Sequence, residues 1–292
     1  MVITDAWMVI VNPKAGSGRG LKDWPIISNQ MYSHGLHFTC LFTEHKYHAM
    51  ELTVKAINDG YRNIVAVGGD GTFSEVLNGA DVKVPMGFIP SGSGNDFIRT
   101  TGEKPLEQRL DEIINGEYKH IDFISVNDKR CLNVMGAGFD VDVLENEAQF
   151  RKTFRGSICY YLGLLKSLLC IRFRPMKMVI DGKEQIDCAC LIFALANGKY
   201  YGGGMPVALD ASVDDGLLDL LVIKKLPLYK VPYILVKFLK GNVRDVKKHT
   251  VSCKCKSFCC YLGDVSMQTD GEIKKNEQVE CKVCAGELKA FL

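Results

Sequence analysis

Short apolar runs alternate with stretches of helical spacing over the first 120 residues. The apolar runs are rich in Val, Ile and Phe and have the length of buried strands. Strand–helix alternation of this kind predicts a mainly parallel, three-layer α/β domain. The expected strands lie at 7–12, 36–43, 63–69 and 84–90, and the expected helices at 50–60 and 72–80.

The pattern changes from about residue 118, where strand-like runs follow one another with turns between them. Helical spacing interrupts these runs at about 155–171 and 228–240. A run of strands after an alternating segment predicts a second, mainly β domain, an antiparallel sandwich or barrel. We therefore expect residues 1–122 to form the α/β domain and residues 123–285 to form the β-rich domain, with a cleft between them.

Composition narrows the class of protein. With 36 Lys and Arg against 34 Asp and Glu, the formal net charge of +2 gives no basic excess for binding nucleic acid. The first residues do not read as a secretory signal, because their apolar run is short and leads into a glycine-rich loop. The most apolar stretch, 157–173, is broken by Lys166, so a transmembrane helix is not expected. A cytoplasmic protein is expected.

Twelve cysteines raise the question of a disulfide or metal framework. Without an export signal, disulfides are disfavoured. Cysteines stand two residues apart in strand-like sequence at 188 and 190 and again at 253 and 255, as small apolar residues on one face of a strand would. A zinc site between the cysteines of 253–260 and 281–284 is the alternative, but strand alternation already explains these residues.

Three glycine-rich loops follow successive strands, at 12–20, 68–72 and 90–100. Glycines at the carboxyl end of a strand let the backbone approach a ligand closely and expose its N–H groups. Ligands of open α/β sheets bind at this edge. The first loop alone fits neither the P-loop nor the full Rossmann spacing. Together, the three loops predict a phosphate-binding edge.

The second loop has a carboxylate between its glycines. Thr72 and Glu75 have the spacing of a capping box and predict a helix over 73–79, whose N-terminus would favour anions. Asp70 would repel a phosphate that it touched directly. It is therefore expected to act through a magnesium ion or water, or on a sugar hydroxyl. A turn-forming Asp-Gly pair is the alternative.

The third loop adds side-chain donors. Ser93 offers a hydroxyl, and Asn95 and Asp96 are expected to cap the short helix that follows. Arg99 lies one turn along that helix and is expected to reach a phosphate, although an ordinary surface arginine would look the same.

These motifs resemble the catalytic domain of the diacylglycerol kinase family, which includes bacterial soluble lipid kinases and the sphingosine and ceramide kinases. The resemblance rests on GGDGT at 68–72 and PSGSGND at 90–96. It continues through NVMGAGFD at 133–140, the stretch 197–220 and TDGE at 269–272, so it spans nearly the whole chain. GGDGT alone also occurs in NAD kinases, whereas the third loop and the late DGE favour a lipid kinase.

The resemblance implies that the α/β domain holds ATP and that the β-rich domain forms the lipid side of the cleft. It also implies that the last residues, about 286–292, return to the first domain. It places nucleotide contacts at Asn12, Thr43, Gly68, Gly69, Asp70, Gly71, Thr72 and Ser93, and the loops themselves add Glu75 and Arg99 as candidates.

Transfer of the γ-phosphoryl group to a hydroxyl needs alignment, charge neutralisation and a carboxylate that accepts the hydroxyl proton. Glu272 matches the family's proposed general base, and Asp270-Gly271 before it predicts a tight turn. Taken from the residues alone, DGE more often marks a solvated hairpin turn. Asp70 and Asp96 are expected to act with catalytic Mg²⁺ or to orient the acceptor, and the sequence does not divide these roles.

A separate cation site is indicated by DASVDDGLLDL at 210–220, where carboxylates and polar residues stand beside a glycine. Bacterial members of the resembled family carry a structural magnesium at this loop. The resemblance therefore implies a site with Asp215 and backbone oxygens near Ser212 and Leu217. A polar turn before the next strand is an equal alternative.

The resemblance implies an ATP-dependent kinase of a lipid hydroxyl, most simply that of diacylglycerol. The alternatives are another lipid acceptor (a sphingoid base or phosphatidylglycerol), a nucleotide kinase of the NAD kinase type, and a lipid-binding regulator without catalysis. A lipid acceptor implies peripheral contact with a membrane. Residues 227–248 mix apolar and basic residues as an interfacial helix does, although a buried helix with a basic end fits equally well. A homodimer is a further expectation.

Overall fold

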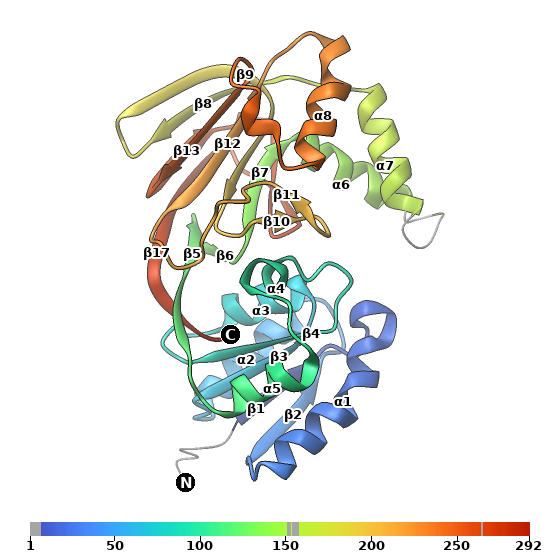
Figure 1. The fold of residues 1–292 in the computed structure, drawn as a ribbon, viewed down its shortest axis with the longest axis vertical. Coiled ribbons are helices and arrows are strands. Elements are labelled where there is room, and N and C mark those ends of the chain that lie inside the picture. Colours follow the sequence, from blue (N-terminus) through green and yellow to red (C-terminus); the bar gives the residue numbers. More distant parts are fainter. Residues whose placement is uncertain (1–6, 151–152, 154–157, 264) are drawn as a thin grey trace.

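The computed structural model describes residues 7–150, 153, 158–263 and 265–292. An α/β domain and a β-rich domain lie one above the other along the long axis of the molecule (Figure 1). The fold class predicted from the sequence is confirmed. None of the helices in the described residues is both long and apolar enough to cross a membrane.

The α/β domain has a central parallel sheet covered on both faces. Its elements are β1 (Trp7–Val11), α1 (Ala15–Ser33), β2 (Phe38–Phe42), α2 (His48–Asn58), β3 (Asn63–Gly68), α3 (Asp70–Gly79), β4 (Met86–Pro90), α4 (Asp96–Thr101) and α5 (Leu106–Ile114). The strands pair in the order β2-β1-β3-β4, all parallel. Along β1, Met8 and Ile10 enter one apolar cluster with α2 and α3, whereas Val9 and Val11 enter another with α1 and α5. Because both faces are covered, the strand is apolar throughout.

Helix α1 was not predicted, and α3 begins earlier than expected. The start of α1 is hidden in the sequence by Gly16, Ser17 and Gly18, which have positive φ values of 55°, 60° and 95°. Helix α3 begins at Asp70, its N-cap position is Gly69, and no side chain caps it. The predicted capping box was therefore wrong.

The β-rich domain is a mainly antiparallel sheet system with three helices on one side (Figure 1). Its elements are β5 (Lys119–Val126), β6 (Lys129–Cys131), β7 (Val134–Gly138), α6 (Phe139–Phe150), α7 (Ile158–Leu169), β8 (Arg174–Ile180), β9 (Glu184–Ala196), β10 (Tyr200–Tyr201), β11 (Met205–Pro206), β12 (Leu218–Lys224), η1 (Leu228–Lys230), α8 (Val231–Leu239), η2 (Val243–Asp245), β13 (Thr250–Cys255), β14 (Ser257–Tyr261), β15 (Ser266–Thr269), β16 (Glu272–Lys275) and β17 (Gln278–Phe291).

Two apolar layers hold this domain together. Leu218, Leu220 and Val222 of β12 pack between the strands, while Leu221 and Ile223 pack toward α6, α7 and α8. The predicted helix at 155–171 corresponds to α7, although residues 155–157 lie outside the described part of the chain. The predicted helix at 228–240 corresponds to η1 and α8. Helix α6 was not predicted.

The last strand joins the two domains. β17 pairs antiparallel with β14 and β5 in the β-rich domain, and its residues Ala290 and Phe291 pair parallel with β4 of the α/β domain. Figure 1 shows it running downward from one domain into the other.

The cysteines of the β-rich domain serve mainly as core residues. Cys188 and Cys190 of β9 face the same inter-strand cluster, as do Cys253 and Cys255 of β13, so the predicted alternation is confirmed. Burial raises the pKa of Cys255 to about 12, which keeps this thiol protonated and unreactive.

Candidate active site

The glycine-rich loops meet at the carboxyl edge of the parallel sheet. The backbone N–H of Asn12, after β1, donates to Val67 at 2.9 Å, and that of Ser91, after β4, donates to Gly68 at 2.7 Å. Thr43, after β2, is buried and donates its N–H to Val11 at 2.9 Å. The backbone of each strand end is thus bonded to its neighbour, which holds the loops as one surface.

Two glycines let the second and third loops touch. A Cβ added at Gly92 would lie 2.5 Å from the Cα of Gly69, so neither position tolerates a larger residue without movement. Asn95 then closes the third loop, since its side chain accepts from the N–H of Gly92 and donates to its carbonyl, both at 3.0 Å. The expected side-chain cap of α4 was wrong, because Asn95 holds the loop instead. Ser93 is exposed at the loop tip.

Thr72 and Glu75 are engaged with other segments of the same edge. The hydroxyl of Thr72 accepts a hydrogen bond of 3.1 Å from the amide of Asn12. Glu75 accepts bonds from the backbone N–H groups of Tyr47 at 3.0 Å and Ala49 at 3.1 Å, so it caps α2 rather than its own helix. The open N-terminus of α3 at Gly69 and Asp70 is left for a ligand.

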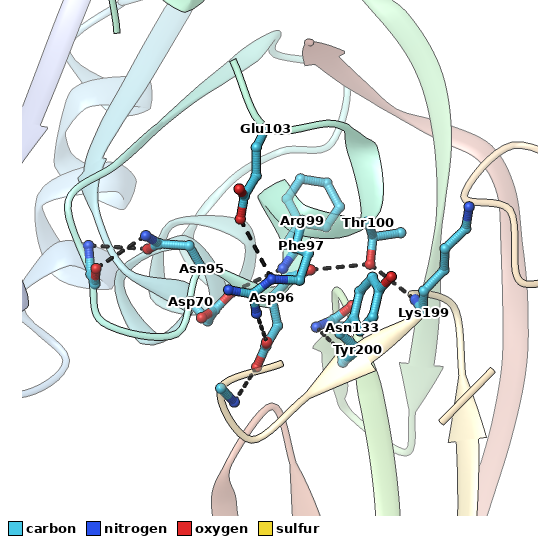
Figure 2. Close-up of polar contacts among 12 residues, drawn as sticks. Asp70, Asn95, Asp96, Phe97, Arg99, Thr100, Glu103, Asn133, Lys199 and Tyr200 are labelled. Carbon is cyan, nitrogen blue, oxygen red and sulfur yellow. Dashed lines mark hydrogen bonds and ion pairs between the residues drawn. The ribbon is translucent and has the colours of Figure 1, made fainter. Parts of the chain in front are cut away.

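Asp70 and Asp96 lie close together between the domains (Figure 2). Asp70 accepts a bond of 3.1 Å from the N–H of Phe97. Asp96 is buried and accepts from Arg99 at 3.0 Å and from the N–H of Gly203 at 2.7 Å. Burial raises the pKa of Asp96, the bond from Gly203 opposes this, and the neighbouring charge of Asp70 raises the pKa further. Two adjacent carboxylates of this kind suit a shared divalent cation.

The helix that carries Asp96 also contacts the β-rich domain (Figure 2). Thr100 accepts a hydrogen bond of 2.9 Å from the N–H of Lys199, and Arg99 lies 5.8 Å from the ring centroid of Tyr200. Arg99 also lies 3.4 Å from Glu103. Asp96 was predicted to act with Mg²⁺ or to orient the acceptor, and Arg99 to donate hydrogen bonds to a phosphate. In the structure the two side chains bond to each other and take part in this contact between the domains.

A large cavity begins at these carboxylates and continues into the β-rich domain. Its volume is about 780 Å³. Asp70, Gly94 and Asp96 line one end, and the side chains of α6, α7, α8 and β12 supply an apolar wall. The edge formed by the glycine-rich loops therefore opens directly onto a pocket with an apolar wall suited to hydrocarbon.

Glu272 lies at the start of β16, beside this cavity's polar end but not among its lining residues. Asp270 and Gly271 have positive φ values of 47° and 85°, and Thr269 pairs with Glu272, so the predicted tight turn is confirmed. The Glu272 carboxylate bonds to Lys129 at 3.0 Å and to Lys46, which follows β2, at 2.9 Å.

The two lysines set the charge state of Glu272. Its burial raises the pKa, but the hydrogen bonds from Lys46 and Lys129, the charge of Lys129 and a hydrogen bond from Tyr47 outweigh burial and leave the pKa below its ordinary value. Glu272 is therefore ionised at neutral pH, as an acceptor of a proton must be.

The loop predicted to hold a structural cation is closed by hydrogen bonds. Asp215 accepts from the N–H of Leu217 at 3.0 Å and pairs with Lys254, while the hydroxyl of Ser212 donates to Asp214. Behind the loop, buried Asp122 accepts from Gly216 and Gly286, each at 2.7 Å. Oxygen atoms around Asp215 suit a hard cation.

Side-chain geometry alone does not build that cation site. Within the described ranges, three side-chain ligand atoms lie within 4.8 Å of one another only at His45, His48 and Glu51, all far from this loop in sequence. A site at Asp215 would therefore depend on backbone oxygens and on displacement of Lys254.

Sequence reasoning missed three polar residues at the cavity. Asn133 and Asp140 lie in the quoted stretch NVMGAGFD, and Gln268 precedes the DGE turn, yet none was assigned a role. The available signal was an acidic residue directly after a Gly-Phe pair at the end of an apolar strand. Lys46 and Lys129 were also missed.

Comparisons with known proteins agree with this arrangement. Residues 6–126 match the model of the diacylglycerol kinase catalytic domain, and residues 133–292 match that of the YegS C-terminal NAD kinase beta sandwich-like domain. The diacylglycerol kinase of Bacillus subtilis is 32% identical over 216 residues, which cover 72% of this chain and 70% of that protein.

Solved structures show the same fold. A crystal structure of a diacylglycerol kinase from Bacillus anthracis has a TM-score of 0.75 and 21% identity, covering 100% of this chain and 98% of that one. An NAD kinase from Archaeoglobus fulgidus in complex with ATP has a TM-score of 0.56 and 12% identity, covering 98% of this chain and 93% of that one.

Proposed function

The chain belongs to the diacylglycerol kinase family, and we propose that this lipid kinase transfers the γ-phosphoryl group of ATP to the free hydroxyl of diacylglycerol, giving phosphatidic acid. The observation that carries the proposal is the cavity of about 780 Å³, because its two ends differ in chemistry. Asp70 and Asp96 lie at one end beside the glycine-rich loops, and leucines and other apolar side chains of α6, α7 and α8 form a wall beyond them. An acceptor with one hydroxyl and long acyl chains fits such a pocket.

The loop residues are proposed to bind the nucleotide. The open N-terminus of α3 leaves backbone N–H groups for phosphate oxygens, and the close approach of Gly69 and Gly92 brings the second and third loops together beside it. Asp70 and Asp96 would hold Mg²⁺ there, which neutralises charge on the phosphates when bound. Arg99 positions Asp96, and Thr72 positions Asn12.

Glu272 is proposed to accept the proton of the lipid hydroxyl. Its ionised state supports this role, since a general base must be unprotonated to act. The bonds from Lys46 and Lys129 occupy the carboxylate, so one of them must loosen when the acceptor hydroxyl enters. Structural Mg²⁺ at Asp215, Ser212 and Leu217 and a homodimer remain predictions.

Contact with a membrane surface is proposed through the rim of the cavity. Leu169 of α7, Leu228 of η1 and Leu239 of α8 line the cavity and are also exposed. Tyr229 and Tyr233 are exposed as well, and lysines stand at 166, 230, 237 and 240 in or next to the same helices. Exposed aromatic and aliphatic side chains on helices that also carry lysines favour an anionic lipid interface.

Transfer of labelled γ-phosphate in mixed micelles tests the proposal. Diacylglycerol, sphingosine and phosphatidylglycerol are offered separately, and NAD is offered without detergent. The proposal predicts labelling of diacylglycerol well above that of the other acceptors. Preferential labelling of sphingosine or phosphatidylglycerol would make that lipid the acceptor in place of diacylglycerol. Labelling of NAD alone would contradict a lipid acceptor, and no transfer at all would favour a lipid-binding regulator without catalysis.

A further inference from the structure

Asp140 is a carboxyl group buried in the apolar part of the cavity, outside the phosphate-binding edge. It occupies the first turn of α6 directly after β7, and only 8% of the residue is exposed. It lines the cavity together with Phe139, Val143 and Ile192. A carboxyl group costs free energy in such surroundings unless a partner satisfies it.

One carboxyl oxygen of Asp140 has a partner and the other has none. Gln268 has its carbonyl oxygen fixed by the N–H of Gly271 at 2.9 Å, so its amide nitrogen faces Oδ2 of Asp140, 3.5 Å away. Oδ2 is therefore the hydrogen-bond acceptor. Among the described residues, nothing bonds to Oδ1, although that oxygen is buried.

Burial favours the neutral form of this carboxyl group. Burial raises the pKa of Asp140 to about 7, the bonds from Val141 and Gln268 oppose the rise, and Asp142 adds to it. In the neutral acid the proton belongs on Oδ1, because Oδ2 receives the amide of Gln268. A protonated Oδ1 is a buried donor that lacks an acceptor.

The charged groups around Asp140 do not disturb its neutral, protonated form. On its own helix, Asp142 is paired with Arg174 of β8. On α7, Lys166 donates to Gln149 at the far end of α6, and Cys159 is buried. The other titratable residues in the described lining of the cavity are Asp70, Asp96, Asp270, Cys170 and Tyr201, and β9 carries Glu184, Asp187, Cys188 and Cys190.

We propose that Asp140 binds the acceptor as a neutral carboxylic acid, with Oδ1 donating a hydrogen bond to an ester carbonyl oxygen of the lipid. The substrate class of the pocket is then a neutral glycerolipid with ester-linked chains. This inference rests on the proposed function and adds the group that recognises the acceptor. A buried acid kept neutral by an apolar site is an effective hydrogen-bond donor.

The lining argues against the two competing lipid classes. Besides the neutral Asp140, three carboxyl groups (those of Asp70, Asp96 and Asp270) and, among the described lining residues, no Lys, Arg or His face the cavity, so an anionic phospholipid would be repelled. A cationic sphingoid base would need Asp140 ionised. Its transfer rate would then rise with pH, the opposite of the dependence expected for an ester.

Matched acceptors test the contact directly. 1,2-Dioctanoylglycerol carries ester carbonyls, and 1,2-dioctylglycerol replaces them with ether oxygens of nearly the same shape. The ratio of kcat/KM for ester over ether is measured in mixed micelles at pH 6 and pH 8. Groups that act equally on both acceptors, such as Glu272, cancel in this ratio.

Four proteins are compared: wild type, Asp140→Asn, Asp140→Leu and the exposed control Asp187→Asn. At pH 6 the wild type should prefer the ester roughly 10-fold, because a buried donor without its acceptor costs that much, and the preference should shrink at pH 8. Asp140→Asn keeps a donor in place and should retain its preference at both pH values. Asp140→Leu should accept ester and ether alike.

Several outcomes would overturn the inference. Equal kcat/KM values for ester and ether with the wild type would contradict the contact between Asp140 and an ester carbonyl, but they would not contradict the proposed phosphorylation of diacylglycerol. If the ester preference of Asp140→Asn falls with pH as that of the wild type does, a group other than Asp140 must titrate. This comparison can be made even if Asp140→Leu does not fold. Transfer to sphingosine that rises with pH and is lost in Asp140→Asn would show an ionised contact. No transfer to either glycerolipid would remove the inference and the proposed function together.

Discussion

Replacing Asp140 by Asn should change how the stability of the protein depends on pH. The pKa of Asp140 rises from 3.8 to about 7 in the folded chain because of burial. Between these values the folded state binds more protons than the unfolded state, so stability falls as pH rises, and the loss is complete above the folded pKa. From pH 5 to pH 8 the group crosses roughly 2 pKa units of this window, which corresponds to about 3 kcal/mol.

The Asn variant removes this titration and keeps the shape of the side chain. The free energy of unfolding of both proteins is measured with urea at pH 5, 6, 7 and 8. The difference between Asp140→Asn and wild type should move in favour of the variant by about 3 kcal/mol across the series, most steeply below pH 7. Asp96, Asp122 and Asp270 also have raised pKa values, but they are present in both proteins and cancel in the difference.

Asp187→Asn serves as the matched control, because its carboxylate is 69% exposed and its replacement should leave the pH dependence unchanged. A difference between Asp140→Asn and wild type that stays constant within about 0.5 kcal/mol from pH 5 to pH 8 would refute the reasoning. The carboxyl group would then be solvated or paired in solution, and the neutral donor proposed for the lipid would be lost with it.

Three further changes have distinct expected results. Gly92→Ala should lower the melting temperature and weaken ATP binding, because its Cβ would lie 2.5 Å from the facing loop. Gly71→Ala, whose Cβ meets nothing within 4 Å, should leave the melting temperature equal or higher, and equal melting temperatures of the two variants would contradict this. Glu75→Ala should cost roughly 1–2 kcal/mol of stability in urea unfolding through the lost cap of α2, with Glu75→Gln intermediate, and no loss would contradict the capping role. Lys129→Met removes a group that lowers the pKa of Glu272, so the acid limb of the pH profile of kcat/KM should move to higher pH. An acid limb at the same pH as in the wild type would show that ionisation of Glu272 does not control the rate.

The α/β domain followed from the sequence because its local and tertiary signals agree. β1 and β3 are apolar on both faces, β1 leads into the glycine-rich loop at 12–20, and β3 ends in glycines at the ligand edge, so length and spacing were enough. Helix α1 was hidden, because its first residues include Gly16 and Gly18 at positive φ and its middle contains Pro25. Helix α6 begins with alternating Asp and Val, which has the period of a strand.

The candidate site was predictable in its residue types and not in its pairings. The motif positions of Asp70, Asp96 and Glu272 were visible in the chain. Glu75 was assigned to its own helix because its real partners at the start of α2 lie 26 and 28 residues away. Asp140 owes its environment to Gln268, 128 residues later, and to helices that only the fold brings near it. Long-range contacts of this kind leave no local pattern.

The most direct test of the account is phosphoryl transfer from ATP to dioctanoylglycerol by Glu272→Gln and Asp70→Asn beside the wild type, with ATP binding measured on the same samples. If Glu272 takes the hydroxyl proton, Glu272→Gln should bind ATP normally and lose roughly 10²- to 10⁴-fold in kcat. Asp70→Asn should lose both transfer and the Mg²⁺ dependence of ATP binding. Transfer at the wild-type rate by either variant would contradict the claim that these carboxylates form one phosphoryl-transfer site.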